Sequence, residues 1–403
     1  MKRLAALSDD IKQYLVVTGN YWAFTLTDGA LRMLVVLYFH QLGYSPLSIA
    51  MLFLFYEIFG VVTNLVGGYL GARLGLNKTM NIGLAIQIIA LLMLAVPPEW
   101  LTIIYVMCAQ ALSGIAKDLN KMSAKSSIKM LVASGQEGTL FKWVAILTGS
   151  KNALKGVGFF LGGLLLTLTT FKGAMLIMGC ALTLVWCYSL YALKDDLGKA
   201  KNKPKFKDIF SKSHSINILS AARLFLFGAR DVWFVVALPL FLSQVFNWDH
   251  WNVGGFLALW VIGYGMVQSI APKLINLKEG ISPAKETVKW AVFLLIITMF
   301  ITLSLYFQWS VEAVLIIGLM IFGVLFAINS SLHSYLIVSM ADADGVSLDV
   351  GFYYMANAMG RLIGTILSGW VFQLYGLTAC LAISCLFITL AAVISIKLPN
   401  TNK

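Results

Sequence analysis

Residues 155–163 read KGVGFFLGG, and residues 361–369, which lie 206 positions later, read RLIGTILSG. When the two stretches are aligned, a cation lies on a cation, and glycine or another small residue recurs at the fourth, eighth and ninth positions. The same offset places Lys151 on Asn357, and an offset of 203 places Asp28 on Asp231. Matches of this kind indicate an internal repeat. The chain is therefore predicted to contain two related halves.

The composition excludes a water-soluble protein of this length. Of the 403 residues, 59% are hydrophobic and 12% are charged, and the mean hydropathy is +0.83. A soluble domain carries about 25% charged residues, so this chain has too little polar surface for a soluble enzyme, a disordered tail or a nucleic-acid-binding domain. A helix that spans a bilayer needs about 20 apolar residues. We therefore predict an all-α polytopic membrane protein.

Apolar runs of spanning length recur twelve times along the chain. A basic stretch, KDDLGKAKNKPKFKDIFSKSH at residues 194–214, separates the first six runs from the last six. We expect a six-helix bundle at 1–193, a linker at 194–214 and a second six-helix bundle at 215–403, related by pseudo-two-fold symmetry. The lysines of the linker are either solvated or in contact with lipid headgroups. The runs are 14–39, 47–71, 79–97, 100–122, 141–169, 173–193, 215–243, 251–273, 287–308, 310–338, 347–374 and 377–397.

The distribution of basic residues predicts the orientation of these runs. If the N-terminus is inside, twenty lysines and arginines fall in inside segments and only Lys172 falls outside. Cytoplasmic loops carry an excess of Lys and Arg, so we expect both termini to be cytoplasmic. The formal net charge of +12 is interpreted in the same way, and not as a contact with nucleic acid.

Ionisable residues at membrane depth are costly and usually functional. Nine basic residues fall within or at the edge of the runs, against four carboxylates. A cation without a partner in a low dielectric needs water or an anionic ligand, so the surplus of five predicts a cavity for an anion with several charges. The basic residues are Arg32, Lys117, Lys121, Lys142, Lys151, Lys155, Arg223, Arg230 and Arg361, and the acids are Asp28, Glu57, Asp118 and Asp231.

The repeat-related cations Lys155 and Arg361 are the first candidates for substrate contact. At a rise of about 1.5 Å per residue, both lie about 21 to 22 Å into their runs, near the midplane. Lys151 is one turn below Lys155 on the same face. Arginine forms a fork that suits phosphate or carboxylate oxygens, whereas lysine acts as a point charge. We expect Lys155 and Arg361 to approach one central site from the two bundles, with structural pairing as the alternative.

Two groups of acids and bases have roles that the sequence leaves open. Asp28 and Arg32 are one helical turn apart and can pair locally, and Glu57 reaches a similar level in the second run. This group either fixes the bundle as a buried charge network or changes protonation at Asp28 or Glu57 during transport. Asp231, beside Arg230 in the seventh run, has the same two possibilities.

Other ionisable or reactive side chains are interpreted as structural. Lys117, Lys121 and Lys142 lie near the cytoplasmic ends of their runs, where lysine side chains can reach the interface. The cysteines fall inside apolar runs and none forms a CxxC, so we expect buried small side chains and neither a disulfide framework nor a metal site. The chain has no HExxH, Ser/His/Asp or GxxxxGK[ST] pattern, so no enzyme, cofactor or ATP-driven pump is predicted. The cysteines are Cys108, Cys180, Cys187, Cys380 and Cys385.

Two short motifs resemble those of the major facilitator superfamily. The stretch GYLGARLG at residues 68–75 is similar to the G-x-x-x-D-R-x-G loop of that superfamily, with Ala72 in place of the acid and Leu76-Asn77 in place of the basic pair. The fifth run keeps the G-x8-G-x3-G spacing of antiporters, although Gly163 stands where a proline is usual. Close helix packing is the alternative explanation for these glycines. The spaced glycines are Gly149, Gly158 and Gly162.

Longer stretches resemble one branch of the superfamily, the ArsJ family of organoarsenical efflux permeases. The resemblance is densest in the first half of the chain. It is carried by VTGNYWAFTLTDGALRMLVVLYFHQLGYSP (17–46), FLFYEIFGVVTNLVGGYLGARLGLNKTMN (53–81), QALSGIAKDLNKMSAKSSIK (110–129), LTGSKNALKGVGFFLGG (147–163) and RLFLFGARDVWFVVALPLF (223–241).

The resemblance implies arsenate resistance in two steps. The functional partner, glyceraldehyde-3-phosphate dehydrogenase, uses arsenate in place of phosphate, and a permease in the bacterial inner membrane expels the product, 1-arseno-3-phosphoglycerate. A cationic cavity suits this two-headed anion. Two alternatives remain open at this point: a carrier of phosphoglycerates or other organophosphates, and a membrane sensor or scaffold that transports nothing.

We expect the following residues to act in such a carrier. The predicted substrate contacts include cations from both halves and one amide, while the acids form a proton-coupling or charge network. The substrate contacts are Lys155, Arg361, Lys151, Arg32, Arg230, Asn357 and Lys117, and the network consists of Asp28, Glu57 and Asp231.

Overall fold

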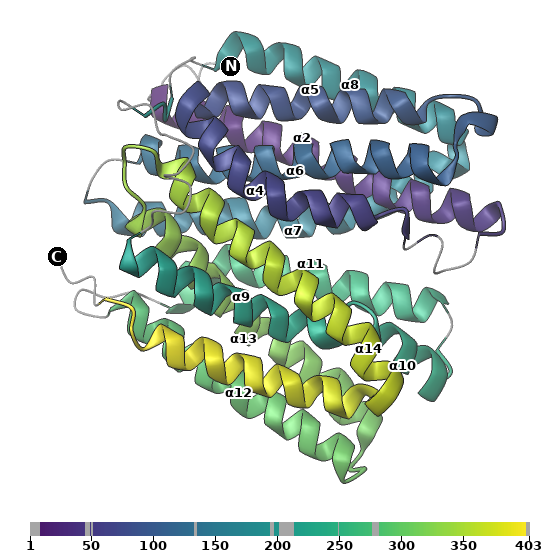
Figure 1. The fold of residues 1–403 in the computed structure, drawn as a ribbon, viewed down its shortest axis with the longest axis vertical. Coiled ribbons are helices and arrows are strands. Elements are labelled where there is room, and N and C mark those ends of the chain that lie inside the picture. The colour runs from purple at the N-terminus through teal and green to yellow at the C-terminus, as the bar shows by residue number, and fades with distance from the viewer. Residues whose placement is uncertain are drawn as a thin grey trace. The chain divides into compact units, whose positions relative to one another are not determined.

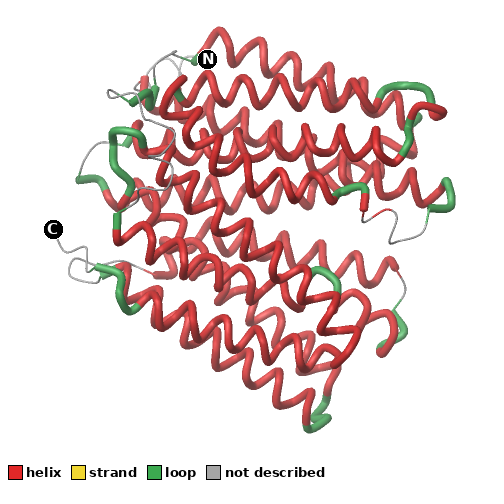
Figure 2. The backbone as a smooth tube through the Cα atoms, in the orientation of Figure 1, coloured by secondary structure: helices red, strands yellow, loops and turns green. Residues whose placement is uncertain are grey.

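A computed structural model describes residues 9–44, 49, 51–132, 135–193, 197–200, 213–248, 250–275 and 282–399. Throughout these ranges the regular structure is helical, without strands, as Figures 1 and 2 show. The all-α prediction is therefore confirmed. Most of the predicted basic linker lies outside the described residues, as do Lys2, Arg3 and Lys278.

The helices follow the apolar runs in order along the chain. In the described ranges the predicted runs lie on helices. The seventh, 215–243, covers α9 and α10, and the last two share α14, which bends at Gly376 (φ +75°). Glycine adopts this conformation without the strain that a Cβ would cause. The elements are α2 (Asp9–Gln41), α4 (Leu54–Leu74), α5 (Leu76–Leu94), η1 (Pro98–Trp100), α6 (Ile103–Leu131), α7 (Glu137–Leu168), α8 (Phe171–Ala192), α9 (His214–Phe234), α10 (Ala237–Val245), α11 (His250–Ile275), α12 (Pro283–Tyr306), α13 (Val311–Met340) and α14 (Val346–Ser395).

Nine candidate membrane spans are found by length and composition in the described part of the chain. One of them covers α9 and α10 together, and one covers the whole of α14. The helices α6 and α7 are not among the nine. Both carry several of the charged and polar residues discussed above, which lower their hydropathy. The two helices that fail the hydropathy criterion, α6 and α7, therefore carry many of the ionisable residues that the sequence places within the membrane.

Contacts divide the chain into two compact units. Unit 1 consists of residues 1–140, 150–211 and 341–355, and unit 2 of residues 141–149, 212–340 and 356–403. The start of α14 belongs to unit 1 because it packs against α4, where Ser347 donates a hydrogen bond to the carbonyl oxygen of Gly68 at 2.7 Å. Gly68 is part of the GYLGARLG motif, so this motif makes room for α14. The division into bundles at 1–193 and 215–403 remains a prediction.

Within unit 1, α6 packs against α4 and α5, and α8 lies alongside α2 and α5 (Figure 1). The helices α2 and α7 approach closely, because a Cβ at Gly158 would lie 2.8 Å from the carbonyl oxygen of Leu26. In unit 2 the repeat-related Gly364 packs in the same way, with a Cβ position 2.8 Å from the carbonyl oxygen of Gly228. Close helix packing is therefore confirmed for Gly158, and for Gly162, where a Cβ would lie 2.5 Å from the carbonyl oxygen of Ala30.

Aromatic side chains fill the core of unit 2. Trp233 meets Phe322 edge to face with ring centroids 5.0 Å apart, and the indole N–H of Trp260 donates to the carbonyl oxygen of Leu319 at 2.8 Å. The indole N–H of a buried tryptophan usually has such a partner. Phe326 stacks on Phe322 at 5.7 Å. This core holds α9, α11 and α13 together around the charged residues described below.

The prediction that all five cysteines are buried is wrong for three of them. Cys108, Cys180 and Cys187 are exposed on the outside of their helices, while Cys380 is buried and Cys385 is intermediate. An apolar sequence context is the same for a lipid-facing side and for the interior of a helical bundle. The sequence therefore cannot tell these two positions apart.

Candidate functional site

Acids and bases of α2 and α4 form the first half of a charge cluster in unit 1. The hydroxyl of Tyr56 donates to Oδ1 of Asp28 at 2.7 Å, and Nη2 of Arg32 donates to Oε1 of Glu57 at 2.9 Å. Asp28 and Arg32 therefore bind partners on α4, and the expected local pair between them is not formed. The guanidinium of Arg32 also lies 4.1 Å from the ring centre of Tyr56, an attractive geometry for a cation over an aromatic face.

Helix α6 supplies the second half of this cluster. Asp118 is almost fully buried, with Oδ1 2.5 Å from Nζ of Lys121 and Oδ2 3.6 Å from Nζ of Lys117. The lysine side chains are only 13 to 14% exposed, so the expectation that Lys117 and Lys121 extend to the membrane interface is wrong. Lys142 at the start of α7 is exposed, in line with that expectation.

Tyr56 links the two halves of the first charge cluster. Its ring lies 4.1 Å from the Arg32 guanidinium and 3.9 Å from Nζ of Lys117, while its hydroxyl binds Asp28. The first charge cluster therefore consists of Asp28, Arg32, Glu57, Lys117, Asp118 and Lys121 around Tyr56. Three cations face three carboxylates in it, so its formal charge is balanced.

A second charge cluster lies in unit 2, where α9 meets α14. Asp231 is fully buried, with Oδ1 2.5 Å from Nη2 of Arg230 and Oδ2 3.1 Å from Nε of Arg361. One carboxylate is thus shared by two guanidinium groups. The Arg230 side chain is 14% exposed and that of Arg361 is 36% exposed. Asp231 is thus paired with Arg230, and the choice between a fixed charge network and a change of protonation at Asp231 stays open.

Arg223 completes the second charge cluster and lies seven residues before Arg230 on α9. Its Nε donates to Oδ1 of Asn357 at 2.9 Å, and its Nη1 donates to the Oγ of Ser330 at 3.1 Å. The guanidinium also lies 3.8 Å from the ring centre of Phe227. The second charge cluster, which consists of Arg223, Arg230, Asp231 and Arg361, contains three cations and one carboxylate, a formal surplus of two positive charges.

The predicted residue Asn357 therefore lies beside Arg223, which was not among the predicted substrate contacts. A polar group surrounds the same serine, because the hydroxyl of Tyr264 and Nε2 of Gln268 both lie 3.1 Å from the Oγ of Ser330. The seven-residue spacing between Arg223 and Arg230 is a signal that could have joined them, since it places both on one face of a helix. For Tyr56 the sequence contains no comparable signal.

The remaining predicted contacts, Lys151 and Lys155, lie half-buried on α7 in unit 1. This part of α7 packs on α2, where a Cβ at Gly29 would lie 2.8 Å from the carbonyl oxygen of Lys155. The indole N–H of Trp22 donates to the Oγ of Ser150 at 2.8 Å. Since Lys155 belongs to unit 1 and Arg361 to unit 2, their predicted convergence stays a prediction.

The surplus of positive charge thus has a defined place. It resides in the second charge cluster, on α7 and at Lys125 of α6, whose side chain is buried and whose Nζ lies 5.2 Å from the ring centre of Tyr354. In the described part of the chain, no group of three or more His, Cys, Asp or Glu side chains is placed to hold a metal ion. The described chemistry is that of guanidinium and ammonium groups, which bind oxyanions.

Comparisons with known proteins place this arrangement in a family. A family model for the Major Facilitator Superfamily matches residues 17–284. The chain belongs to the major facilitator superfamily. Its members are transporters, so this multi-pass membrane protein is a membrane transporter of the superfamily. No curated protein matches the chain significantly in sequence.

Solved structures of the superfamily share the fold at low sequence identity. The proton:xylose symporter XylE has a TM-score of 0.76 at 12% identity, covering 97% of this chain and 96% of its own. A bacterial homologue of the iron transporter ferroportin has a TM-score of 0.75 at 13% identity, and the match covers 97% of this chain and 99% of the homologue. The human organic anion transporter MFSD10 has a TM-score of 0.75 at 16% identity, and the match covers 96% of this chain and 100% of MFSD10. At such identities these similarities show the superfamily fold alone.

Proposed function

We propose that this transporter exports 1-arseno-3-phosphoglycerate, an anionic organoarsenical, and thereby confers arsenate resistance. The surplus of two positive charges in the second charge cluster is the observation that carries the anionic substrate class. The sequence resemblance to organoarsenical efflux permeases supports the particular substrate. The proposal places the protein in the bacterial inner membrane with both termini cytoplasmic, which the excess of basic residues in the inside loops supports.

The second charge cluster has the chemistry to bind and release an oxyanion. Guanidinium groups form paired hydrogen bonds with phosphate-like and carboxylate oxygens. Arg361 is the more exposed partner of Asp231, so an incoming oxyanion can take its place beside Arg361 while Arg230 keeps the buried carboxylate neutralised. The proposed contacts for a two-headed anion also include Lys151 and Lys155, the half-buried cations of α7.

Transport in this proposal follows alternating access, in which a bound substrate is exposed first to one side of the membrane and then to the other. Glyceraldehyde-3-phosphate dehydrogenase supplies the arseno-ester in the cytoplasm, and the released anhydride breaks down to arsenate outside. Among the acids proposed for proton coupling, Asp28 is a better candidate than Glu57. Its described donor is the neutral hydroxyl of Tyr56, whereas Glu57 is held in an ion pair with the Arg32 cation.

A second candidate function is the transport of phosphoglycerates or other organophosphates. Arsenate and phosphate esters present the same tetrahedral oxyanion to a guanidinium group. The charge surplus of the second charge cluster therefore supports both substrates equally, and the arsenic-containing one rests on the resemblance.

Uptake into inverted vesicles tests the proposal. We expect the enzymatically made arseno-ester to accumulate in inverted vesicles that contain the transporter, and plain 3-phosphoglycerate to accumulate at least tenfold less. Repeating the assay with and without a pH gradient reveals whether protons drive the flux. Uptake of 3-phosphoglycerate alone would favour the second candidate and contradict the first.

Variants of the proposed contacts sharpen this test. We expect Lys155→Ala and Arg361→Ala to abolish both uptake and arsenate resistance. Lys142→Ala is the matched control, because Lys142 is an exposed cation on the same helix as Lys155. Immunoblots of the membrane fraction must show equal amounts of protein. Unchanged resistance in both alanine variants would refute the assignment of these two residues.

A further inference from the structure

Helix α6 carries a lysine at every fourth position along its second half. Positions four apart lie on nearly the same face of a helix, so these side chains form one column. At a rise of 1.5 Å per residue the column is about 18 Å long. The same stretch of sequence contains one carboxylate, Asp118. The lysine column consists of Lys117, Lys121, Lys125 and Lys129.

The middle of the lysine column is covered by protein. The Lys121 side chain is 13% exposed and Lys125 is 3% exposed. A lysine near the end of a membrane helix usually extends its ammonium group to the interface, and a buried charge is costly unless other groups compensate it. Lys129, at the end of the column, is half-buried and interacts electrostatically with Glu137 and Asp342. Contact with the cytoplasmic surface therefore does not explain Lys121 and Lys125.

One aromatic ring lies against both of these lysines. Nζ of Lys121 is 4.7 Å from the ring centre of Tyr354, and Nζ of Lys125 is 5.2 Å from it. Tyr354 belongs to the part of α14 that packs in unit 1, and it is 3% exposed. The face of an aromatic ring carries partial negative charge. The ring of Tyr354 therefore occupies a place where two ammonium groups attract negative charge.

The carboxylate of Asp118 is shared in a way that can release Lys121. Its Oδ1 lies 2.5 Å from Nζ of Lys121, and its Oδ2 lies 3.6 Å from Nζ of Lys117. When Lys121 turns to another partner, Lys117 still neutralises the buried acid. Asp231 of the second charge cluster is likewise shared by two guanidinium groups. A ligand with negative charge can thus recruit Lys121 without leaving Asp118 uncompensated.

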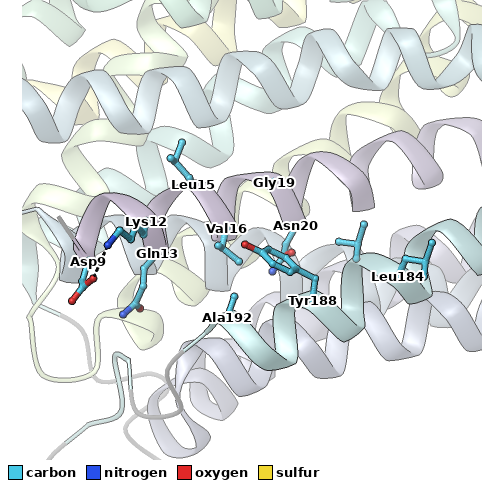
Figure 3. A pocket seen from close by; sticks show the side chains of 11 residues that line it. Asp9, Lys12, Gln13, Leu15, Val16, Gly19, Asn20, Leu184, Tyr188 and Ala192 are labelled. Carbon is cyan, nitrogen blue, oxygen red and sulfur yellow. Dashed lines mark hydrogen bonds and ion pairs between the residues drawn. The ribbon is translucent and has the colours of Figure 1, made fainter. Parts of the chain in front are cut away.

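A groove between α2 and α8, also in unit 1, has a different charge balance (Figure 3). The charged side chains among its described lining residues are Asp9 and Lys12, whose Oδ1 and Nζ lie 3.3 Å apart. One cation is thus matched by one carboxylate, and both side chains are largely exposed to solvent screening. The lysine column, and not this groove, is the place in unit 1 that attracts an anion.

We propose that Lys121, Lys125 and Tyr354 form a cytoplasmic loading site for the oxyanion of a phosphate or arsenate ester. The oxyanion displaces the Tyr354 ring and contacts both ammonium groups, because a full negative charge attracts them more strongly than a ring face does. This inference rests on the proposed function, which supplies the anionic substrate and puts the end of α6 at the cytoplasmic side. It adds a contact for the substrate besides those proposed at Arg361 and on α7.

Equilibrium binding of 3-phosphoglycerate to the purified transporter in detergent tests the loading site without transport. We expect Lys125→Gln to weaken binding about tenfold, since a hydrogen bond between charged groups is lost. Lys125→Arg should bind within about threefold of the wild type, because a guanidinium group also binds phosphate oxygens. Lys142→Gln changes an exposed cation and is the control. Equal affinities of Lys125→Gln and the wild type, or no binding by any of these proteins, would overturn the proposal.

Variants of Tyr354 give a result of opposite sign. Tyr354→Leu removes the ring with which the anion competes, so we expect 3-phosphoglycerate to bind about three- to tenfold more tightly. Tyr354→Phe keeps the ring face and should bind within about twofold of the wild type. A residue that only supports the fold would weaken binding when it is truncated. Weaker or unchanged binding by a folded Tyr354→Leu protein therefore contradicts the loading site, and the Lys125 variants decide the question alone if Tyr354→Leu does not fold.

Uptake of the arseno-ester into inverted vesicles, which expose the cytoplasmic face, separates this site from the proposed function. We expect Lys125→Gln to raise the KM about tenfold while the maximal rate changes less than about twofold. If the loading site is wrong and the proposed function is right, Lys125→Gln takes up the ester with the KM of the wild type. If the proposed function is wrong and the loading site is right, 3-phosphoglycerate binding depends on Lys125 but the ester does not accumulate in wild-type vesicles.

Discussion

The Nε of Arg361 lies 3.1 Å from Oδ2 of Asp231, and these two residues are 130 positions apart in the chain. Asp231 is completely buried, while the Arg361 side chain is about one-third exposed. The other oxygen of the carboxylate is held by Arg230. Because Asp231 keeps a cationic partner when Arg361 leaves, Arg361 is the member of this group that can move to a ligand.

Neutralising the shared carboxylate tests this arrangement. We expect Asp231→Asn to lower the free energy of unfolding by about 3 to 5 kcal/mol, since two partly buried guanidinium groups lose their counter-ion. Added phosphate should then raise the melting temperature of the variant more than that of the wild type, because the anion replaces the lost charge. Thermal unfolding in detergent measures both effects. Asp10→Asn, at an exposed position, is the control, and an equal response to phosphate in all three proteins contradicts the interpretation.

The geometry of the Arg361 guanidinium matters beyond its charge. We expect Arg361→Lys to raise the KM for the transported anion about tenfold while the maximal rate changes less, because an ammonium group cannot form the paired bonds of a guanidinium. Initial rates of vesicle uptake over a range of substrate concentrations provide the measurement. A KM equal to that of the wild type would show that the substrate does not form paired hydrogen bonds with the Arg361 guanidinium.

The glycines of the repeat offer a test with controls on the same helices. Gly158→Ala and Gly364→Ala would each place a Cβ 2.8 Å from a carbonyl oxygen of a neighbouring helix. We expect a loss of about 1 to 3 kcal/mol in each case. The repeat-related Gly163→Ala and Gly369→Ala have room for the methyl group, so they should be neutral or stabilising by up to about 1 kcal/mol. Melting temperatures that do not separate the two pairs would contradict the packing assignment.

Asp28 and Glu57 are expected to respond differently when neutralised. Asp28→Asn should leave the fold intact and remove the response of uptake to a pH gradient, since the proposed proton carrier is lost. Glu57→Gln should instead reduce stability, because it breaks the ion pair with Arg32. Uptake with and without a gradient, together with thermal unfolding, distinguishes the variants. Full gradient dependence in Asp28→Asn would assign Asp28 to a fixed charge network.

Much of the fold follows from local sequence. Each apolar run predicts a helix because a spanning segment must satisfy its own backbone hydrogen bonds, and the match between residues 155–163 and 361–369 reappears as the equivalent packing of Gly158 and Gly364. The candidate site was only partly predictable. Its charged residues could be found by their depth, but the role of Tyr56 as the link between Asp28, Arg32 and Lys117 could not.

The amino-acid sequence by itself determined that this chain enters a membrane as a series of helices, and that positive charge within them exceeds negative charge, because both properties depend on composition and order alone. Only the tertiary structure decided which acid faces which cation. Arg32 turns to Glu57 and not to the nearby Asp28, and Asp231 holds a residue from a distant helix. Such partners are chosen by the packing of helix faces, where a buried charge must find whichever opposite charge the neighbouring helix presents.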